Sequence, residues 1–338
     1  QGRFLVVFLS PCSRLSFLMD PTRHSLVIYD EDSWSVRLHK LSQALYEEIV
    51  EILYDFITRT GRLERALTPS YWREHAAQMV RIEKCLRQRN GLRLRSVATN
   101  VNEEDTDADI VLNEEQIKAD GERRMAMRVA LERAVAHMDA YEELIEQVES
   151  MRQELYVKGN EKHEKLLRKL WKLMGREGEE LRGVVSPQWR TIGFQGDDPS
   201  TDFRGMGVLS LLQMIFFAQF DVEAMLSVLS LSHHPTIGFP FAIAGITFTS
   251  LTRALLLNGQ LKRHFYNSSS SPPTLDAFHH SYCRIFSLFA SFWRIASPPS
   301  VMHFNAVRAD FEKALSRRLE KDNANLDRTT AEQLFNEL

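Results

Sequence analysis

The sequence predicts an all-α protein, from three observations. Apolar side chains recur at three- and four-residue steps in many segments, no run alternates polar and apolar residues as a half-buried strand does, and no internal repeat is visible. A chain of 338 residues that is 44% hydrophobic and 26% charged has enough apolar mass for one large core or two smaller ones. We therefore expect packed helices and no sheet.

The first 38 residues carry no regular pattern, so we expect residues 1–38 to be an N-terminal segment that is either disordered or a targeting piece. Residues 4–9 form a short apolar run that superficially resembles the middle of a signal peptide. Met19, with a polar segment after it, is a candidate start of the native chain. Residues 1–18 are then extra translated sequence or a targeting piece, and both interpretations stay open.

Residues 39–112 are predicted to form an N-terminal helical region followed by a linker. One amphipathic helix is expected at 39–59 and a second through 71–86, where Asn90 and Gly91 supply a helix stop. Residues 102–109 are acidic and lack bulky apolar side chains, which indicates a solvated linker. Its alternating aspartates resemble the start of a calcium loop, but Ile110 and Gln116 replace the required glycine and glutamate. We expect no calcium site there.

The rest of the chain is predicted to form the main domain, at 113–325, and a C-terminal tail at 326–338. Good helix formers dominate 113–174, where Gly121 and Gly159 are the interior breaks and two or three helices are expected. After residue 175 glycine, proline and aromatic residues replace this pattern. Helical patterns then resume at 206–220, 222–231, 241–257, 275–296 and 301–319. The serines and prolines at 268–273 indicate a flexible connector.

Composition excludes several classes of protein. The formal net charge of −3 does not provide the positive field that nucleic-acid binding requires. The cysteines are few, odd in number and far apart, which favours a reducing, intracellular compartment over a disulfide framework. The longest apolar stretches, 208–220 and 239–251, fall short of the roughly 20 residues that cross a bilayer. We expect no nucleic-acid partner and no transmembrane span.

Motifs for metal, nucleotide and hydrolase chemistry are absent or incomplete. No phosphate-binding loop of the G-x-x-x-x-G-K-[ST] type and no G-x-S-x-G elbow occurs. The segment that starts His163-Glu164 resembles a zinc-protease helix, but Leu167 stands at the second ligand position. His279, His280 and Cys283 either share a metal-binding helix face or are ordinary helix residues, and we favour the second interpretation. We expect no metal and no cofactor bound by this chain itself.

The segment WRTIGFQGDDPSTDFRGMG, residues 189–207, is unusually dense in glycine, aromatic and acidic residues. We call it the signature segment. Gly193 and Gly196 permit tight turns, and Pro199 fixes a further one. Ser200, Thr201 or Asp202 is expected to cap a helix that starts near Gly205. The buried rings of three aromatic residues would anchor the loop: Trp189, Phe194 and Phe203.

Arg204 directly follows the last of these aromatic anchors, and two interpretations of it remain open. It pairs with Asp197, Asp198 or Asp202 and ties the loop down, or it points outward between two small residues, Gly205 and Gly207, where another protein could approach closely. Composition alone does not decide between them.

The signature segment resembles that of the ELMO domain-containing proteins. Their pattern is Trp, three residues, Gly-Phe-Gln, three residues, Pro, one residue, Thr-Asp-Phe-Arg-Gly, one residue and Gly, and every fixed position is filled here. Similar segments continue at 57–67, 163–174, 234–246, 261–267 and 278–293, so the resemblance covers most of the chain beyond about residue 40. The chain departs from the pattern at Ser210, where glycine is common, and at Met214, where leucine is common.

The resemblance implies an ELMO-domain fold with an N-terminal helical extension, and a GTPase-activating protein for Arf and Arf-like small GTPases. Arg204 would then be the catalytic residue, acting in trans on the GTP-bound partner, while GTP and Mg²⁺ belong to that partner. Such a protein regulates another protein's GTP hydrolysis and needs no substrate pocket of its own. A second branch of the family, which works with DOCK exchange factors on Rac, lacks this arginine and carries additional domains.

The resemblance also implies candidate motif and partner-binding residues. They are Trp189, Gly193, Phe194, Gln195, Pro199, Thr201, Asp202, Phe203, Gly205 and Gly207. Gln195 and Asp202 either brace the loop or touch the partner, and we favour bracing. The alternative function is a non-catalytic helical adaptor that binds a small GTPase or its regulators. The expected location is cytoplasmic and peripheral at organelle membranes.

Overall fold

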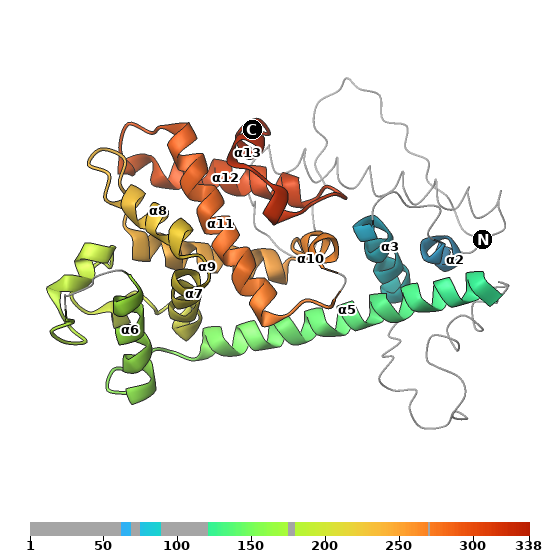
Figure 1. Cartoon of the computed structure of the whole chain (residues 1–338), viewed down its shortest axis with the longest axis horizontal. Helices are drawn as coiled ribbons and strands as arrows, with labels where there is room; N and C mark the ends of the chain where they lie inside the picture. Colours follow the sequence, from blue (N-terminus) through green and yellow to red (C-terminus); the bar gives the residue numbers. More distant parts are fainter. Residues whose placement is uncertain (1–61, 69–74, 89–120, 175–179, 270) are drawn as a thin grey trace, which may run out of the picture. The chain divides into compact units, whose positions relative to one another are not determined.

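The computed structural model describes residues 62–68, 75–88, 121–174, 180–269 and 271–338. Within these ranges every regular element is a helix, so the predicted all-α class is confirmed (Figure 1). The N-terminal segment 1–38, the helix expected at 39–59 and the acidic linker at 102–109 lie outside the described residues.

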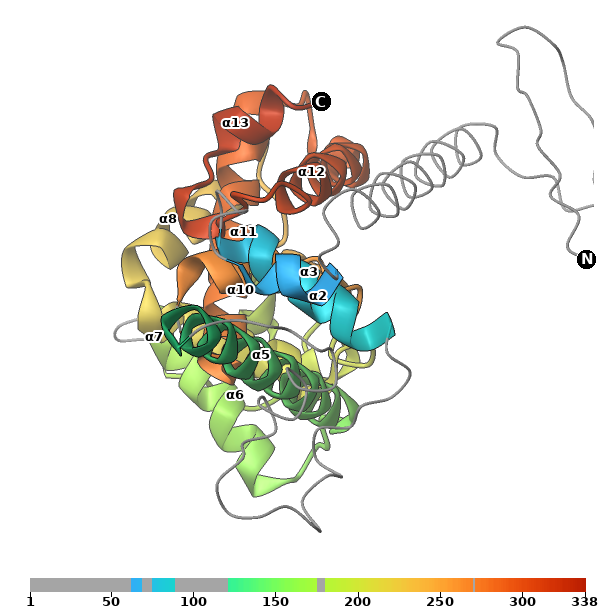
Figure 2. The same cartoon turned by 90° about the vertical axis from the view of Figure 1, so that its right-hand side faces the viewer.

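Helix α5 (Gly121–Gln153) is 33 residues long and contributes to two apolar cores. Its composition of alanine, glutamate, arginine and methionine favours an uninterrupted helix. Helices α2 (Arg62–Leu67) and α3 (His75–Gln88) pack against its N-terminal half, as Figures 1 and 2 show. Together they bury a small apolar set, the N-terminal cluster: Leu63, Ala66, Leu67, Ala76, Met79, Ile82, Cys85, Leu86, Met127, Leu131, Ala134 and Tyr266.

A buried carboxylate joins the N-terminal cluster to the rest of the domain. The Glu83 side chain on α3 is only 5% exposed and forms an ion pair with Lys262, at the start of α10 (Lys262–Ser268). Tyr266 of α10 donates a hydrogen bond to the second Glu83 oxygen at 3.2 Å, and Arg87 pairs with the first at 2.9 Å. Because a buried charge is tolerated only when it is paired, these contacts fix α3 against α10.

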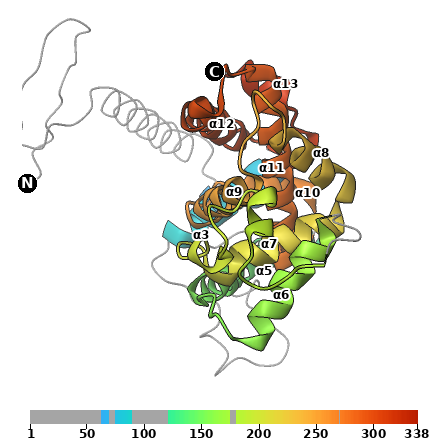
Figure 3. The same cartoon turned by 90° about the vertical axis from the view of Figure 1, so that its left-hand side faces the viewer.

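The main core is built from the C-terminal half of α5 and the helices that follow it. These are α6 (Glu161–Leu173), α7 (Gly207–Phe220), α8 (Val222–Ser232), α9 (Phe241–Leu257), α11 (Leu275–Ala296) and α12 (Phe304–Leu319). Helices α7 and α9 carry apolar residues on most of their surface and are largely buried. Figure 3 shows α6 beside α7, where the buried face of α6 contributes Leu167, Leu170 and Trp171.

Most predicted helices agree closely with the structure, and the differences lie in short elements. The helix expected at 301–319 starts with one 3₁₀ turn, η5 (Val301–His303), before α12. Helix α10 begins before the serine-rich segment and was not predicted from the pattern. Residues 326–338, which we expected to be a tail, form η6 (Leu326–Arg328) and α13 (Ala331–Phe335), with Leu326 and Leu334 fully buried in the main core.

Among the described residues, no single helix has both the length and the apolar composition needed to cross a membrane. Two sharply bent pairs, α7 with α8 and α9 with α10, meet that criterion by length and composition only.

Candidate functional site

A row of packed aromatic rings anchors the signature segment to the core. Trp189 lies edge-on to Trp171 of α6 at 5.4 Å between ring centroids, and Phe194 lies edge-on to Trp189 at 5.5 Å. Phe203 continues the row at 5.7 Å from Phe194 and contacts Tyr156 at 5.5 Å. The three signature aromatics are at most 4% exposed, so the prediction that their rings are buried is confirmed. Edge-to-face packing of this kind holds the loop backbone in one place.

Gly193 and Gly207 are the glycines that the backbone requires. Gly193 closes the 3₁₀ helix η3 (Pro187–Ile192) with a φ of +85°, and a Cβ there would lie 2.3 Å from the Phe241 nitrogen. Gly207 has a φ of +55°, and a Cβ there would lie 2.3 Å from the Arg152 carbonyl oxygen. No side chain fits at either position, because both the dihedral angle and the neighbouring backbone exclude it. Gly193 thus sets the loop against α9, and Gly207 sets α7 against the end of α5.

The helix that follows the signature segment is capped from outside it. The expectation that Ser200, Thr201 or Asp202 caps this helix is wrong. Residues 199–201 form their own 3₁₀ turn, η4, which the Asp198 side chain caps. Helix α7 starts at Gly207 without a side-chain cap, and its Val208 N–H donates instead to the Glu154 carbonyl at 2.8 Å.

A buried histidine fixes the connector that provides this carbonyl. His163 of α6 is 3% exposed, and its Nδ1 accepts a hydrogen bond from the Val157 N–H at 2.9 Å. Its Nε2 therefore carries the proton and donates to the Glu154 carboxylate at 3.0 Å, which holds the pKa of that carboxylate below its ordinary value. The Tyr156 ring lies between the His163 and Phe203 rings. The Tyr156 ring thus packs between α6 and Phe203, the residue that precedes Arg204.

The neighbouring aspartates Asp197 and Asp198 form ion pairs with side chains other than Arg204. Asp197 pairs with Arg190 at 2.8 Å. Asp198 pairs with Lys158 at 3.2 Å. Burial alone would raise the pKa of Asp198, but hydrogen bonds from Ser200 and Lys158 outweigh burial and lower it. These two ion pairs hold the loop against Lys158 and Arg190.

Asp202 braces the loop internally, because its carboxylate accepts the Gln195 N–H at 3.0 Å. The Gln195 side chain is exposed. Pro199 is buried at the first position of η4, and the exposed Thr201 donates its hydroxyl to the Asp198 carbonyl at 3.0 Å. Bracing was our favoured interpretation of Asp202, and this contact is consistent with it.

Arg204 is exposed, and within the described ranges it forms no hydrogen bond and no ion pair. The arrangement in which it ties the loop down through Asp197, Asp198 or Asp202 is not the one that the structure contains. Gly205 beside it is exposed, and a Cβ there would meet open space. Gly207 does not contribute to this opening, because it is buried against α5. The Arg204 side chain therefore has hydrogen-bond donors that are unpaired within the described part of the chain, and it is accessible to solvent.

The histidine and cysteine group of α11 is built into the packing of the helix. His279 is 6% exposed and packs on Phe216 at 5.0 Å between ring centroids, and burial lowers its pKa to about 4. His280 packs on Phe220 at 4.0 Å, and Cys283 is buried. In the described part of the chain, no three histidine, cysteine or acidic side chains converge as metal ligands would.

Comparison with known proteins matches the family described as ELMO/CED-12 over residues 146–308. ELMO domain-containing protein 1 of Bos taurus is 35% identical over 279 residues, which cover 77% of this chain and 85% of that protein. The chain belongs to the ELMO/CED-12 family. ELMO domain-containing protein 2 of Homo sapiens is 36% identical over 64% of this chain and 74% of its own length. ELMO domain-containing protein B of Dictyostelium discoideum is 33% identical over 54% of this chain and 63% of its own length.

The region matched to the ELMO/CED-12 family starts inside α5 and ends inside α12, and it contains the whole signature segment. Our sequence reasoning found the signature residues of this ELMO domain but missed those that support them from outside. Tyr156 and Lys158 contact the signature segment, and the His163–Glu154 pair holds the connector beside it in place. The sequence around His163 matches only an incomplete zinc motif. The position of His163 on the apolar face of an otherwise basic helix was the available signal for a buried structural role.

Proposed function

We propose that this chain is a GTPase-activating protein for GTP-bound Arf-family small GTPases, and that Arg204 enters the partner's active site in trans. The observation that carries the proposal is that Arg204 is exposed and unpaired, within the described residues, on a braced loop. The signature's resemblance to the arginine-containing branch of the family points to the same residue. The reaction would take place in the cytoplasm, at the surface of organelle membranes.

The loop geometry supports this role because a donated arginine must already be in position. Negative charge develops on the β- and γ-phosphate oxygens during hydrolysis, and an arginine supplied by a partner accelerates the reaction by roughly 10³ to 10⁵. Phe203, Asp202 and Gly207 fix the backbone on both sides of Arg204. Little backbone conformational entropy is then lost when the loop binds a partner.

Neighbouring groups also leave the Arg204 charge available. The three aspartates nearest in sequence have other partners, so no carboxylate must be displaced when Arg204 leaves water. A guanidinium presents a planar fork of donors to two phosphate oxygens, which the single ammonium of lysine does not reproduce. GTP and Mg²⁺ are supplied by the partner in this mechanism.

The test is single-turnover GTP hydrolysis by a panel of Arf and Arf-like GTPases. We expect the wild-type chain to stimulate at least one of them, and both Arg204→Ala and Arg204→Lys to lose most of that stimulation. Arg182→Ala is the matched control, because Arg182 is exposed in the segment just before the signature and its side chain makes no hydrogen bond among the described residues. That variant should stimulate like the wild type.

Each other result points away from this mechanism. If both Arg204 variants stimulate fully, the arginine assignment is wrong. If the chain binds the GTP form but hydrolysis stays at its intrinsic rate across the panel, the chain is a non-catalytic adaptor. Loss of stimulation in Arg182→Ala as well would mean that the general positive charge of this region, and not one guanidinium, is responsible.

A further inference from the structure

Helix α6 carries a basic face on the side opposite to the one that packs against the signature segment. Its exposed residues are Glu161, Lys162, Lys165, Arg168, Lys169 and Lys172, so all but one are cationic. The opposite face is buried through His163, Leu167, Leu170 and Trp171. The helix therefore lies on the surface of the domain with one side in the main core and the other covered by positive charge.

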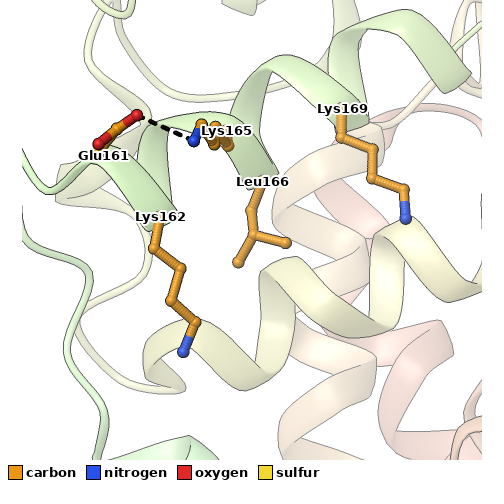
Figure 4. A pocket seen from close by; sticks show the side chains of 5 residues that line it. All are labelled: Glu161, Lys162, Lys165, Leu166 and Lys169. Carbon is orange, nitrogen blue, oxygen red and sulfur yellow. Dashed lines mark ion pairs between the residues drawn. The ribbon is translucent and has the colours of Figure 1, made fainter.

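The lysines line one shallow hollow. Lys162, Lys165, Leu166 and Lys169 surround it together with Glu161, and it has a volume of about 390 Å³. The lysines follow the i, i+3, i+7 spacing of a single helix face, with Leu166 between them. Figure 4 shows Lys162, Leu166 and Lys169 side by side along the helix, with Lys165 next to them in its ion pair with Glu161.

The charge of this face is only weakly compensated. Lys165 pairs with Glu161 at 2.9 Å, but these side chains are 73% and 85% exposed. Lys162 lies 3.6 Å from Glu154 and is 74% exposed. Ion pairs that exposed are weak, because water and salt screen them. Lys169 and Lys172 have no ion pair among the described residues. The chain as a whole has a formal charge of −3, so this positive face is a local feature.

We propose that the α6 lysine face binds the surface of a bilayer that contains anionic phospholipids. A row of flexible point charges at one level fits a fluid plane of phosphate groups, and lysine stems bury their methylene groups at that boundary. A fixed protein carboxylate would favour the fork of arginine, and α6 has only Arg168. Leu166 adds an apolar contact in the middle of the row, as interfacial helices do.

Binding through this face would bring the signature segment close to the membrane. Helix α6 packs against α7, and Trp171 of α6 contacts Trp189 of the signature segment at 5.4 Å. The connector before α6 is also tied to the signature through Lys158 and Asp198. The inference does not rest on the proposed function, since binding to lipid alone is what it states.

The test is co-sedimentation of the full chain with vesicles and contains no GTPase. We expect binding to phosphatidylcholine vesicles with about 30 mol% phosphatidylserine and little binding to phosphatidylcholine alone. Each lysine near such a surface contributes about fivefold in affinity, so Lys162→Gln, Lys165→Gln and Lys169→Gln together should weaken binding about 100-fold. Arginine at the same three positions keeps the charge and should keep the binding.

The matched control removes the same charge elsewhere. Lys84, Lys313 and Arg328 are exposed on other elements and make no ion pair among the described residues, and their replacement by glutamine should leave vesicle binding unchanged. Equal binding to neutral and anionic vesicles, or equal loss in both glutamine triples, overturns the proposal. So does full release from the vesicles by duplex RNA at an equal phosphate concentration, which would indicate a nucleic-acid site.

Discussion

Gly207→Ala should destabilise the domain strongly, although it adds only one methyl group. Gly207 is the last residue of the signature segment and the first of α7. A Cβ at this position would lie 2.3 Å from the Arg152 oxygen and 2.5 Å from the Glu154 oxygen. Both are backbone atoms, one in the last turn of α5 and one just after it, so no side-chain rotation can relieve the contact.

Two costs add in this variant. A left-handed φ of +55° costs about 1–2 kcal/mol for a residue with a Cβ. Moving α7 away from α5 disturbs a packed core, which costs about 1–3 kcal/mol, and it stretches the hydrogen bond from the Val208 N–H to the Glu154 carbonyl. The free energy of unfolding should therefore fall by about 2–5 kcal/mol, a large part of the roughly 5–15 kcal/mol that a domain has.

Urea unfolding followed by tryptophan fluorescence measures this loss. Gly205→Ala is the matched control in the same segment, because Gly205 is exposed and a Cβ there has nothing within 4 Å. It should stay within about 0.5 kcal/mol of the wild type. If Gly207→Ala unfolds at the wild-type midpoint, or if both variants lose equally, the contact between α5 and α7 does not have the role described here.

Three further predictions concern other parts of the chain. Glu83→Ala leaves Lys262 and Tyr266 without their buried partner and should cost about 3–5 kcal/mol in urea unfolding, whereas Glu142→Ala removes only an exposed partner of Arg87 and should cost less than about 1 kcal/mol. Tyr156→Ala removes the ring against Phe203 and should reduce GTPase stimulation, while Tyr156→Phe keeps that ring and should not; equal activity of the two variants would contradict this support. Burial lowers the pKa of His279 from 6.5 to about 4, so its contribution to stability is complete above pH 6.5 and is lost as pH falls toward 4, by about 1.4 kcal/mol per pH unit. The difference in unfolding free energy between wild type and His279→Gln should therefore shrink over that pH range, and a constant difference would show that His279 does not stay neutral.

The long helices could be predicted because their signals are local. Helix α11 spans Leu275–Ala296 as the periodicity predicted, since Thr274 caps its start and Pro298 follows closely after its end. Short helices could not be predicted in this way. Helix α10 depends on distant contacts, such as the Leu326 N–H that donates to His264 Nδ1 at 3.2 Å. The same contact packs residues 326–338, whose sequence alone indicates only a polar tail.

The candidate site could likewise be predicted only in part. That the three aromatic residues would be buried followed from their size and from the glycines around them. The exposure of Arg204 did not follow, because it depends on which cations occupy the aspartates. Lys158 lies 40 residues before Asp198, and no sequence rule pairs them. Asp202 binds a backbone N–H that only the folded loop brings within reach.

Helix α5 also shows that the unit which folds is larger than the segment matched to the family. At 33 residues it is about 50 Å long, and the family match begins at residue 146, within its last third. A fragment cut at that residue would lose Tyr141, whose hydroxyl donates to the Leu256 carbonyl at 2.6 Å. It would also lose the α5 residues that belong to the N-terminal cluster. A stable fragment for biochemical work should therefore retain all of α5 together with α2 and α3.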